Sequence, residues 1–350
     1  MTMQKKPEGN ALDFKEFVGQ HRERVYQIIC SYFPDNAPPE FIKMLRSYTD
    51  RKGQYRRPGY AILWTLLYGG KLEDVMLPAA VQQISEDYFL MHDDWMDGNS
   101  VRRGLPAAHI LFGAEYAVDA GDTLHNILWK MAYDAASVLG GERGKRYFDK
   151  FYDIMLTTHI GQYLDIRLAR EVKDITKFKI EDYYKSIHAK SAYYSVYGPM
   201  QCGAIIAGAK DDVVNGIAGY GTPAGIAFQI KDDILDCIAT EGGLGKSIGT
   251  DVRDGVKTLI LWHAVQHADS ATLAKMKGVY AKDRELKSEA EIRFVLDKFV
   301  ELGSIAYAEK EAARLTKEAI EKFEIAARGI KSPLKGLAMS SIGQTTKREK

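Results

Sequence analysis

The fold is decided by residues 81–97, VQQISEDYFLMHDDWMD, an apolar stretch that closes with an acidic cluster. Its apolar side chains recur at intervals of three and four residues, at Val81, Ile84, Tyr88 and Met91. This spacing predicts a helix. The cluster itself is Asp93-Asp94-x-x-Asp97, and on a helix these three carboxylates fall within an arc of about 100°.

A second cluster of the same spacing, Asp232-Asp233-x-x-Asp236, lies within residues 229–236, QIKDDILD. Three carboxylates this close repel one another and destabilise a helix unless a cation lies among them. Oxygen ligands suit hard divalent ions, above all Mg²⁺, which takes few carboxylates together with substrate phosphate. One such cluster is more often a solvated turn or a helix cap. Two of identical spacing among apolar residues predict a magnesium site.

The composition limits the choice of architecture and partners. A chain of 350 residues can bury a large core, and it carries no linker-like or low-complexity stretch. We therefore expect one domain over residues 1–350, with residues 1–12 and 336–350 as flexible tails. The formal net charge of +1 gives no electrostatic reason to expect nucleic acid as a partner. No segment approaches about 20 uninterrupted apolar residues, so no membrane span is expected.

The cysteines and the amino terminus indicate the compartment. Cys30, Cys202 and Cys237 are scattered, without the spacing of metal ligands. This usage fits a reduced intracellular protein. Residues 1–10 are polar and lack the apolar core of a signal peptide. A cytoplasmic protein is expected.

Helical periodicity dominates the whole chain, and strand alternation is nowhere sustained. One amphipathic helix is expected to stop before Pro34, and Pro38-Pro39 is expected to open the next. Further helical blocks are expected over residues 110–138, 145–170, 180–208, 212–238, 256–267, 289–302 and 304–325. The sequence therefore predicts an all-α protein, a single large helical bundle around a central cavity.

Basic residues lie in unusual company near the acidic clusters. Arg102-Arg103-Gly104 follows the first cluster, and Lys190 lies among small and aromatic residues. Such side chains usually extend to water, so each alone is weak support for a site. Lys246 lies in Gly245-Lys246-Ser247, which is partly similar to a phosphate-binding loop. That interpretation fails, because Thr240 stands where the loop requires glycine and no strand precedes it.

In combination, these motifs resemble those of the trans-prenyl diphosphate synthases, and most closely the short-chain type that makes farnesyl or geranylgeranyl diphosphate. The likeness runs from about Lys52 to Lys257. It comprises both acidic clusters, Arg102-Arg103-Gly104, and the following shorter motifs: Gly161-Gln162 with Asp165, Lys190-Ser191 before Tyr193-Tyr194, Phe228-Gln229, and Lys246 with Gly249-Thr250-Asp251.

The resemblance implies a prenyltransferase that joins isopentenyl diphosphate head to tail with an allylic diphosphate. One charge pair at about 4 Å contributes only about 4 kcal/mol at an effective dielectric constant of about 20, less than the barrier reduction of about 8 kcal/mol or more that enzymes achieve. The family instead uses three Mg²⁺. The resemblance implies direct metal ligands at Asp93, Asp97 and Asp232, and direct or water-mediated ligands at Asp94, Asp233 and Asp236.

The resemblance also assigns roles to the neighbouring polar residues. It implies diphosphate binding by Arg102, Lys190, Lys246, Gln162 and Lys257. Ser191 and Gln229 would face the allylic cation, and the released pyrophosphate would take the final proton. The family normally forms homodimers through helices beside the active site, so a homodimer is expected.

The chain departs from the family pattern where the homoallylic diphosphate is bound. Arg57 and Arg103 match the family's arginines, but Gln54 stands in place of a lysine and Glu86 in place of a histidine or glutamine. Three outcomes stay open. A nearby cation, Lys52 or Arg56, compensates; Glu86 pairs with one of these cations; or binding is lost. The last outcome would leave a terpene synthase or an allylic diphosphatase.

Two aromatic residues precede the first acidic cluster and bear on product length. Phe89 lies one helical turn, about 5.4 Å, before Asp93 on the same face. In the family this position and that of Tyr88 limit chain length, and an aromatic pair is typical of fifteen-carbon products. We expect farnesyl diphosphate first and geranylgeranyl diphosphate second, unless both rings are only core.

The basic end, residues 347–350, either closes the homoallylic site or is solvated. A non-catalytic partner of another synthase is a third hypothesis, against which the two intact acidic clusters argue.

Overall fold

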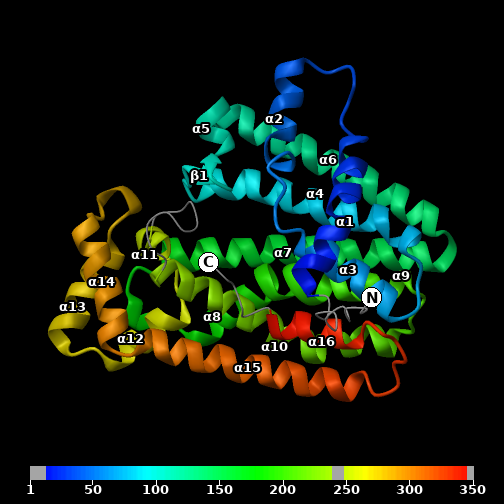
Figure 1. Ribbon diagram of the computed structural model, residues 1–350. Coiled ribbons are helices and arrows are strands. Elements are labelled where there is room, and N and C mark those ends of the chain that lie inside the picture. The colour runs from blue at the N-terminus through cyan, green and yellow to red at the C-terminus, as the bar shows by residue number, and fades with distance from the viewer. Residues whose placement is uncertain (1–12, 239–247, 345–350) are drawn as a thin grey trace, which may run out of the picture.

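The chain folds into a helical assembly in a computed structural model that describes residues 13–238 and 248–344 (Figure 1). The all-α class that the sequence predicts is confirmed. Strands within the described residues are limited to β1 (Val101–Arg102) and β2 (Leu105–Pro106), which pair antiparallel with Val101 opposite Pro106. This small hairpin follows the first acidic cluster and turns through Arg103 and Gly104, both at positive φ.

The amino-terminal half of the chain contains the helices that carry the first acidic cluster and its surroundings. They are α1 (Phe14–Cys30), α2 (Pro39–Thr49), α3 (Arg56–Leu67), α4 (Leu72–Met96), α5 (Ala108–Phe112), α6 (Ala114–Leu139) and α7 (Gly141–Glu171). Gly140, at a φ of 66°, separates α6 from α7, as the Gly140-Gly141 pair leads one to expect.

The carboxyl-terminal half carries the second acidic cluster on its longest helix. Its helices are α8 (Ile180–Ile187), α9 (Gly198–Ile206), α10 (Asp211–Ile238), α11 (Thr250–Asp254), α12 (Leu259–His267), α13 (Ser270–Ala281), α14 (Glu289–Glu301), α15 (Ser304–Ala326) and α16 (Lys335–Gly343). Short 3₁₀ turns lie at Ile175–Lys177 (η1) and Arg284–Leu286 (η3).

Two helical regions differ from the blocks expected from the sequence. The expected block 180–208 is interrupted by a ten-residue π-helix, η2 (His188–Tyr197), between α8 and α9. Single-sequence periodicity cannot foresee this wider winding, because it depends on what packs against the segment. Helix α13 was not expected at all; Asp269 caps it, accepting a hydrogen bond from the backbone N–H of Thr272 at 2.8 Å.

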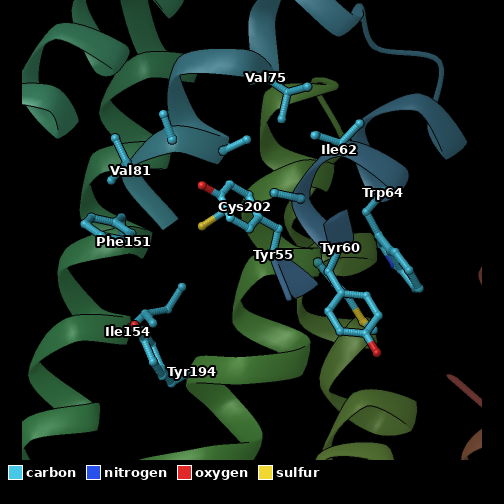
Figure 2. Close-up of a cluster of buried hydrophobic side chains, with 14 of the residues drawn as sticks. Tyr55, Tyr60, Ile62, Trp64, Val75, Val81, Phe151, Ile154, Tyr194 and Cys202 are labelled. Carbon is cyan, nitrogen blue, oxygen red and sulfur yellow. The ribbon is translucent and has the colours of Figure 1, made fainter. Parts of the chain in front are cut away.

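Buried side chains form two cores. The larger one joins α1, α3, α4, α6, α7, η2 and α9, and Figure 2 shows a part of it around Tyr60 and Trp64. Trp64 is fully buried, and its indole Nε1 donates to the hydroxyl of Tyr220 at 2.8 Å. The smaller core joins α8, α12, α13, α14 and α15.

Helix α10 belongs to both cores. Ile217 and Tyr220, in its first half, pack in the larger core, whereas Ile230 and Ile234, in its second half, pack in the smaller one. Helices α10 and α15 lie side by side along the molecule, and α11 to α14 gather at one end of it, at the left of Figure 1. The second acidic cluster is therefore carried by a helix that packs in both cores.

The carboxyl-terminal segment corrects one expectation. Residues 336–350 were expected to be a flexible tail, but Lys335–Gly343 form α16, which packs on α15, α1 and α3. Leu337, Ala338 and Ile342 are buried there, and burial of this apolar face orders the segment. Residues 1–12 and 345–350 lie outside the described residues, so the expectation for them, and the expectation of one domain, stay predictions.

Within the described ranges, no helix combines the length and the apolar character needed to cross a membrane.

Candidate active site

A cavity of about 870 Å³ lies between α1, α3, α4, α7, η2 and α10. Lysine and arginine side chains outnumber aspartate and glutamate on its wall. Its wall includes these residues that the sequence singles out: Gln54, Arg57, Glu86, Phe89, Asp93, Arg102, Arg103, Gln162, Lys190, Ser191, Gln229 and Asp232. The structure thus brings both acidic clusters and the basic motifs to one cavity.

Other predicted site residues do not line this cavity. They are Tyr88, Asp94, Asp97, Asp233, Asp236 and Lys257. Lys246 lies outside the described residues. One aspartate from each cluster, Asp93 or Asp232, therefore lines the cavity, whereas Asp94 and Asp233 are buried.

In the first cluster, Asp93 and Asp94 have different surroundings. Asp93 lies in the last turn of α4 and accepts a hydrogen bond from Gln162 Nε2 at 2.6 Å. Asp94 is fully buried, and its carboxylate accepts from Arg102 Nε at 2.9 Å and from the Tyr48 hydroxyl at 2.7 Å. Arg102, the predicted diphosphate ligand, thus lines the cavity and is held there by the buried carboxylate of Asp94.

Asp97 shows the electrostatic effect of burial and of a neighbouring carboxylate on its pKa. It follows the last residue of α4 and is half-buried. Burial and repulsion from Asp93 together raise the pKa of Asp97 to about 7. A cation between the two carboxylates would relieve both effects, which is the electrostatic requirement for a metal site.

Lys190 lies on η2 and faces the first cluster from the opposite wall. Its Nζ donates to Asp165 Oδ2 at 2.6 Å and lies 4.0 Å from Asp93 Oδ1. Burial opposes its charge, but Asp165, Asp93 and Asp97 raise the pKa of Lys190 above its ordinary value. Lys190 is therefore a charged side chain poised between the carboxylates and the cavity.

Gly161 explains how η2 approaches α7. A Cβ built on Gly161 would lie 2.3 Å from the backbone nitrogen of Lys190, far inside van der Waals contact. Glycine thus permits the two backbones to touch, and this contact carries Lys190 and Ser191 toward Gln162 and Asp93. In the Gly161-Gln162 motif, the glycine thus permits the close approach of η2, and the glutamine donates a hydrogen bond to Asp93.

The second cluster repeats the arrangement of the first. Asp232 lines the cavity, whereas Asp233 is buried and accepts from Gln229 Nε2 and from the Tyr183 hydroxyl, each at 2.8 Å. Burial raises the pKa of Asp233 to about 7. Asp236 Oδ2 accepts from the backbone N–H of Asp251 at 3.0 Å, which links α10 to the start of α11.

The fit of the clusters to magnesium can be tested on these contacts. The donors are carboxylate oxygens, as Mg²⁺ prefers, and crowding at Asp93 and Asp97 favours a cation. Within the part of the chain that the structure describes, however, no three acidic, histidine or cysteine side chains converge tightly enough to hold an ion by themselves. The carboxylates fit a site that substrate phosphate oxygens would complete.

The region of Gln54 and Glu86 resolves one of the alternatives. Glu86 pairs with Arg57, at 3.0 Å, and with Arg103, at 3.7 Å. The expectation that it pairs with Lys52 or Arg56 is therefore wrong. Lys52 Nζ instead donates to Glu23 Oε2 at 2.6 Å, and Arg56 Nε donates to Gln54 Oε1 at 2.9 Å.

Backbone strain concentrates in the same region. Lys52, Tyr55 and Arg103 have φ values of 42°, 53° and 52°, the positive values found at non-glycine residues in the described chain. Each such conformation costs about 1–3 kcal/mol and persists where the surroundings enforce it. Tyr55 immediately precedes α3, so this geometry fixes where Arg56 and Arg57 begin the helix.

The two aromatic residues before Asp93 point to different sides. The Phe89 ring lines the cavity and packs edge-on against Tyr194, with centroids 5.0 Å apart. Tyr88 is buried behind it, with its ring 4.7 Å from that of His125 and its hydroxyl 3.3 Å from His159 Nε2. Helical geometry had placed Phe89 on the cavity face and left Tyr88 less certain.

Lys257 is nearly fully buried away from the cavity wall. Its ammonium group lies against the backbone oxygens of Gly255 and, at 3.4 Å, Ala169. Burial, with repulsion from Lys287, lowers the pKa of Lys257 to about 7. The predicted contact of Lys257 with substrate stays a prediction.

Sequence reasoning missed the tyrosines behind the clusters. Tyr48 holds Asp94 and Tyr183 holds Asp233, so each cluster has its second aspartate bound by one buried tyrosine. Each tyrosine lies some 50 residues along the chain from its aspartate, and no local motif signals the contact. Ser195, which accepts from Arg57 at 2.8 Å, was missed for the same reason.

Comparison with known proteins identifies the family. The polyprenyl synthetase family model matches residues 38–298. The geranylgeranyl diphosphate synthase of Sulfolobus acidocaldarius is 30% identical over 342 residues, covering 96% of this chain and 99% of that protein. The geranylfarnesyl diphosphate synthase of Aeropyrum pernix is 32% identical over 74% of this chain and 79% of its own length.

Solved structures agree. A geranylgeranyl pyrophosphate synthase from Corynebacterium glutamicum, complexed with isoprenyl diphosphate and magnesium, has a TM-score of 0.86 at 25% identity and covers 97% of this chain and 100% of that one. The Pyrococcus horikoshii geranylgeranyl pyrophosphate synthetase has a TM-score of 0.79 at 28% identity, over 96% and 99%. The two acidic clusters, their shared cavity and these likenesses lead to one conclusion: the chain belongs to the polyprenyl synthetase family.

Proposed function

We propose that this protein catalyses the Mg²⁺-dependent head-to-tail condensation of isopentenyl diphosphate with an allylic diphosphate. The observation that carries the proposal is one cavity with carboxylates of both clusters, Asp93 and Asp232, on one part of its wall and the arginines Arg57 and Arg103 on another. A metal-bound diphosphate suits the acidic part, and a diphosphate bound by side chains suits the basic part.

Ionisation of the allylic substrate would take place between α4 and α10. The carbon–oxygen bond breaks, and its electron pair leaves with pyrophosphate. Lys190 and Arg102 face this charge, and Asp93, Asp97 and Asp232 would hold magnesium, which supplies positive charge to the leaving group when bound. Lys246, outside the described residues, is assigned to the same group by its motif.

The new carbon–carbon bond would form beside Ser191 and Gln229, which line the cavity. The double bond of isopentenyl diphosphate attacks the allylic cation, and the proton released from the adduct passes to pyrophosphate. The amide of Gln229 is oriented by its hydrogen bond to Asp233, so its oxygen is free to point away from that carboxylate. These residues orient and shield the cation rather than react with it.

We propose a product of twenty carbons, with fifteen carbons second. The sequence alone had favoured fifteen because of the Tyr88-Phe89 pair. Two observations shift the preference: Phe89 lines the cavity whereas Tyr88 is turned toward His125, and the relatives cited above are named geranylgeranyl and geranylfarnesyl synthases. A single ring at the wall leaves more room for a growing chain than two.

The proposed reaction is tested by product analysis. Purified protein is incubated with Mg²⁺, labelled isopentenyl diphosphate and each allylic starter of five, ten or fifteen carbons. An extended, labelled prenyl diphosphate is expected, with twenty carbons predominant. Absence of label from any extended product, with every starter, would exclude the proposed condensation.

One observation favours a second candidate function. Glu86 neutralises part of the basic wall that would hold isopentenyl diphosphate. A protein that ionised an allylic diphosphate without elongating it would be a terpene synthase or an allylic diphosphatase. The same incubation distinguishes these activities, since they consume the allylic substrate without incorporating label.

We further propose a cytoplasmic homodimer. Large apolar side chains are exposed along α6 and α7, at Tyr116, Tyr133, Val138, Tyr152, Leu156, Ile160 and Tyr163. An exposed apolar face of this extent is typical of a protein interface. The cytoplasmic assignment rests on Cys30, Cys202 and Cys237, which form no disulfide.

A further inference from the structure

Arg57 is held in place by more than its partner Glu86. Its Nη2 donates to the Ser195 hydroxyl at 2.8 Å, and its guanidinium lies over the Tyr194 ring, 4.1 Å from the centroid. Its Nε is buried and makes no hydrogen bond within the described structure. Removing Glu86 would therefore leave the guanidinium where it is, with donors to spare.

Arg103 is likewise fixed independently. Its Nη1 donates to the Tyr48 backbone oxygen at 2.7 Å and to Asp87 Oδ1 at 3.2 Å. Gly53 also packs closely against this guanidinium group, since a Cβ on Gly53 would lie 2.5 Å from Arg103 Nη2. That Nη2 is buried without a hydrogen-bond acceptor among the described residues, and the Glu86 carboxylate is 3.7 Å away.

Glu86 lies between these two guanidinium groups on the cavity wall. Gln83 Nε2 donates to its Oε2 at 2.9 Å. Although burial acts to raise it, Arg57 and Arg103 hold the pKa of Glu86 below its usual range, so the side chain is an anion at neutral pH. With Asp87 on Arg103, these two arginines face two carboxyl groups, which offset most of the charge of this pair of arginines.

A diphosphate at this wall needs the same donors. It carries more negative charge than one carboxylate and presents more acceptor oxygens. It would therefore displace Glu86 from the two arginines, but its binding is weakened by the attraction between Glu86 and these arginines. The loose 3.7 Å contact to Arg103 and the hydrogen bond from Gln83 give Glu86 a way to withdraw while both arginines stay fixed.

We propose that Glu86 is an internal counter-anion that competes with the diphosphate of the five-carbon substrate for Arg57 and Arg103, and so sets how weakly this protein binds that substrate. The inference rests on the proposed condensation. It makes Glu86 a specificity-determining residue that acts on binding of isopentenyl diphosphate and leaves the ionisation of the allylic partner unaffected.

The test is Glu86→Gln, which removes the charge and keeps the shape. Binding of isopentenyl diphosphate is measured by calorimetry without Mg²⁺, in the presence of a chelator, and steady-state kinetics are measured with Mg²⁺. We expect the dissociation constant and the KM for isopentenyl diphosphate to fall roughly ten-fold, with kcat and the allylic KM unchanged within about two-fold. Glu73→Gln, an exposed residue in the first turn of the same helix, is the matched control and should change neither constant.

The remaining outcomes overturn the inference. An unchanged or weaker affinity in Glu86→Gln would show that Glu86 orients the arginines instead of competing for them. Should Glu86→Gln fail to fold, Glu86→His, neutral at pH 8, is judged by the same criterion. If the wild-type protein elongates its substrate and Glu86→Gln binds no more tightly, only this inference fails; if no variant and no wild-type preparation incorporates label, the proposed condensation fails.

Discussion

Asp93 and Asp232 differ from their neighbours Asp94 and Asp233 although the residue type is the same. The first of each pair lines the cavity, and the second is buried against a tyrosine, Tyr48 or Tyr183. A turn of about 100° per residue separates adjacent side chains on a helix, so only one of each pair can face the substrate directly. The buried aspartates orient side chains of the wall, Arg102 and Gln229.

The first prediction concerns the aspartates on the wall. Asp93→Ala or Asp232→Ala should lower kcat about a thousand-fold or more, because a ligand of the charge-neutralising ions is lost where negative charge develops. The measurement is steady-state turnover at saturating Mg²⁺. Asp212→Ala, an exposed aspartate in the first turn of α10, is the control. A loss of less than ten-fold would contradict the assignment.

Asp97 gives a prediction on stability. Its folded-state pKa of about 7 exceeds the unfolded value of about 4, so the metal-free folded protein binds the extra proton between these values, and its free energy of unfolding falls as pH rises from about 4 to about 7. Asp97→Asn lacks this loss and should be more stable than wild type by on the order of 1–3 kcal/mol at pH 8, after allowance for solvent screening.

The measurement for Asp97→Asn is urea unfolding at pH 5 and pH 8 in a chelator. The difference from wild type should be larger at pH 8. Asp212→Asn should show no such pH-dependent difference. Equal differences at both pH values would show that Asp97 carries no unfavourable charge in the folded protein.

At the scale of elements, the site depends on how helices touch. The π-helix η2 meets α7 at Gly161 with the two backbones in contact, and it carries Lys190, Ser191, Tyr194 and Ser195 to the cavity. A π-helical winding changes the angular spacing of side chains, so residues that an α-helix would spread apart can share one wall. This one element supplies contacts to both the acidic and the basic parts of the cavity.

The contact of η2 with α7 is tested by Gly161→Ala. The added methyl group would collide with the Lys190 backbone, so η2 must shift, and we expect kcat to fall at least ten-fold together with a lower melting temperature. The control is Gly216→Ala, on the exposed face of α10, where a Cβ meets no atom within 4 Å and alanine should stabilise the helix slightly. Equal behaviour of the two variants would contradict the close contact.

Helix α4 also carries the residue expected to limit product length. Phe89→Ala removes the ring that meets Tyr194 at the cavity wall, and the product should lengthen by one or more five-carbon units. Tyr88→Ala, which alters the layer behind the wall, should lengthen the product less. Chromatography of dephosphorylated products is the measurement. An unchanged product from Phe89→Ala would show that the ring serves only to pack the core.

Much of this arrangement could be predicted at the level of elements. The helical period located α4 and α10, but the expectation of three carboxylates on one side of each helix is met at the cavity wall only by Asp93 and by Asp232. The winding of η2 could not be predicted from its own residues, because the segment packs tightly against both α7 and α10. The short helix α16 was missed since its apolar residues are ordered by packing on α15, α1 and α3, which lie far from it in the sequence or do not specify it locally.

The site was predicted in part for a related reason. Asp93, Asp232 and Phe89 were placed at the site by their spacing on a helix, and Lys190 by the motif that it shares with the family. The partner of Glu86 was not, because a pairing between α4, α3 and the β1–β2 turn depends on tertiary geometry. Sequence separation hides Tyr48 and Tyr183 in the same way.

At the scale of the whole molecule, the apolar faces of α6 and α7 call for a partner. Leu156→Glu places a charge in the middle of that face and should convert the proposed dimer to a monomer at micromolar concentration, because an unpaired charge at a buried interface is strongly unfavourable. Light scattering during gel filtration is the measurement. Val300→Glu, an exposed apolar position on α14, is the control. A wild-type monomer would refute the proposal.

Helix α10 passes through both cores and carries the second acidic cluster at its end. This one helix therefore connects the packing of the two cores to the cavity. Ile217 packs in the larger core more than four helical turns before Asp232, and Pro223 between them removes one backbone hydrogen bond of the helix. A substitution that loosens either half of α10 is therefore expected to shift the carboxylate of Asp232 as well, so adaptation of this protein to heat or cold has few helices that can change independently.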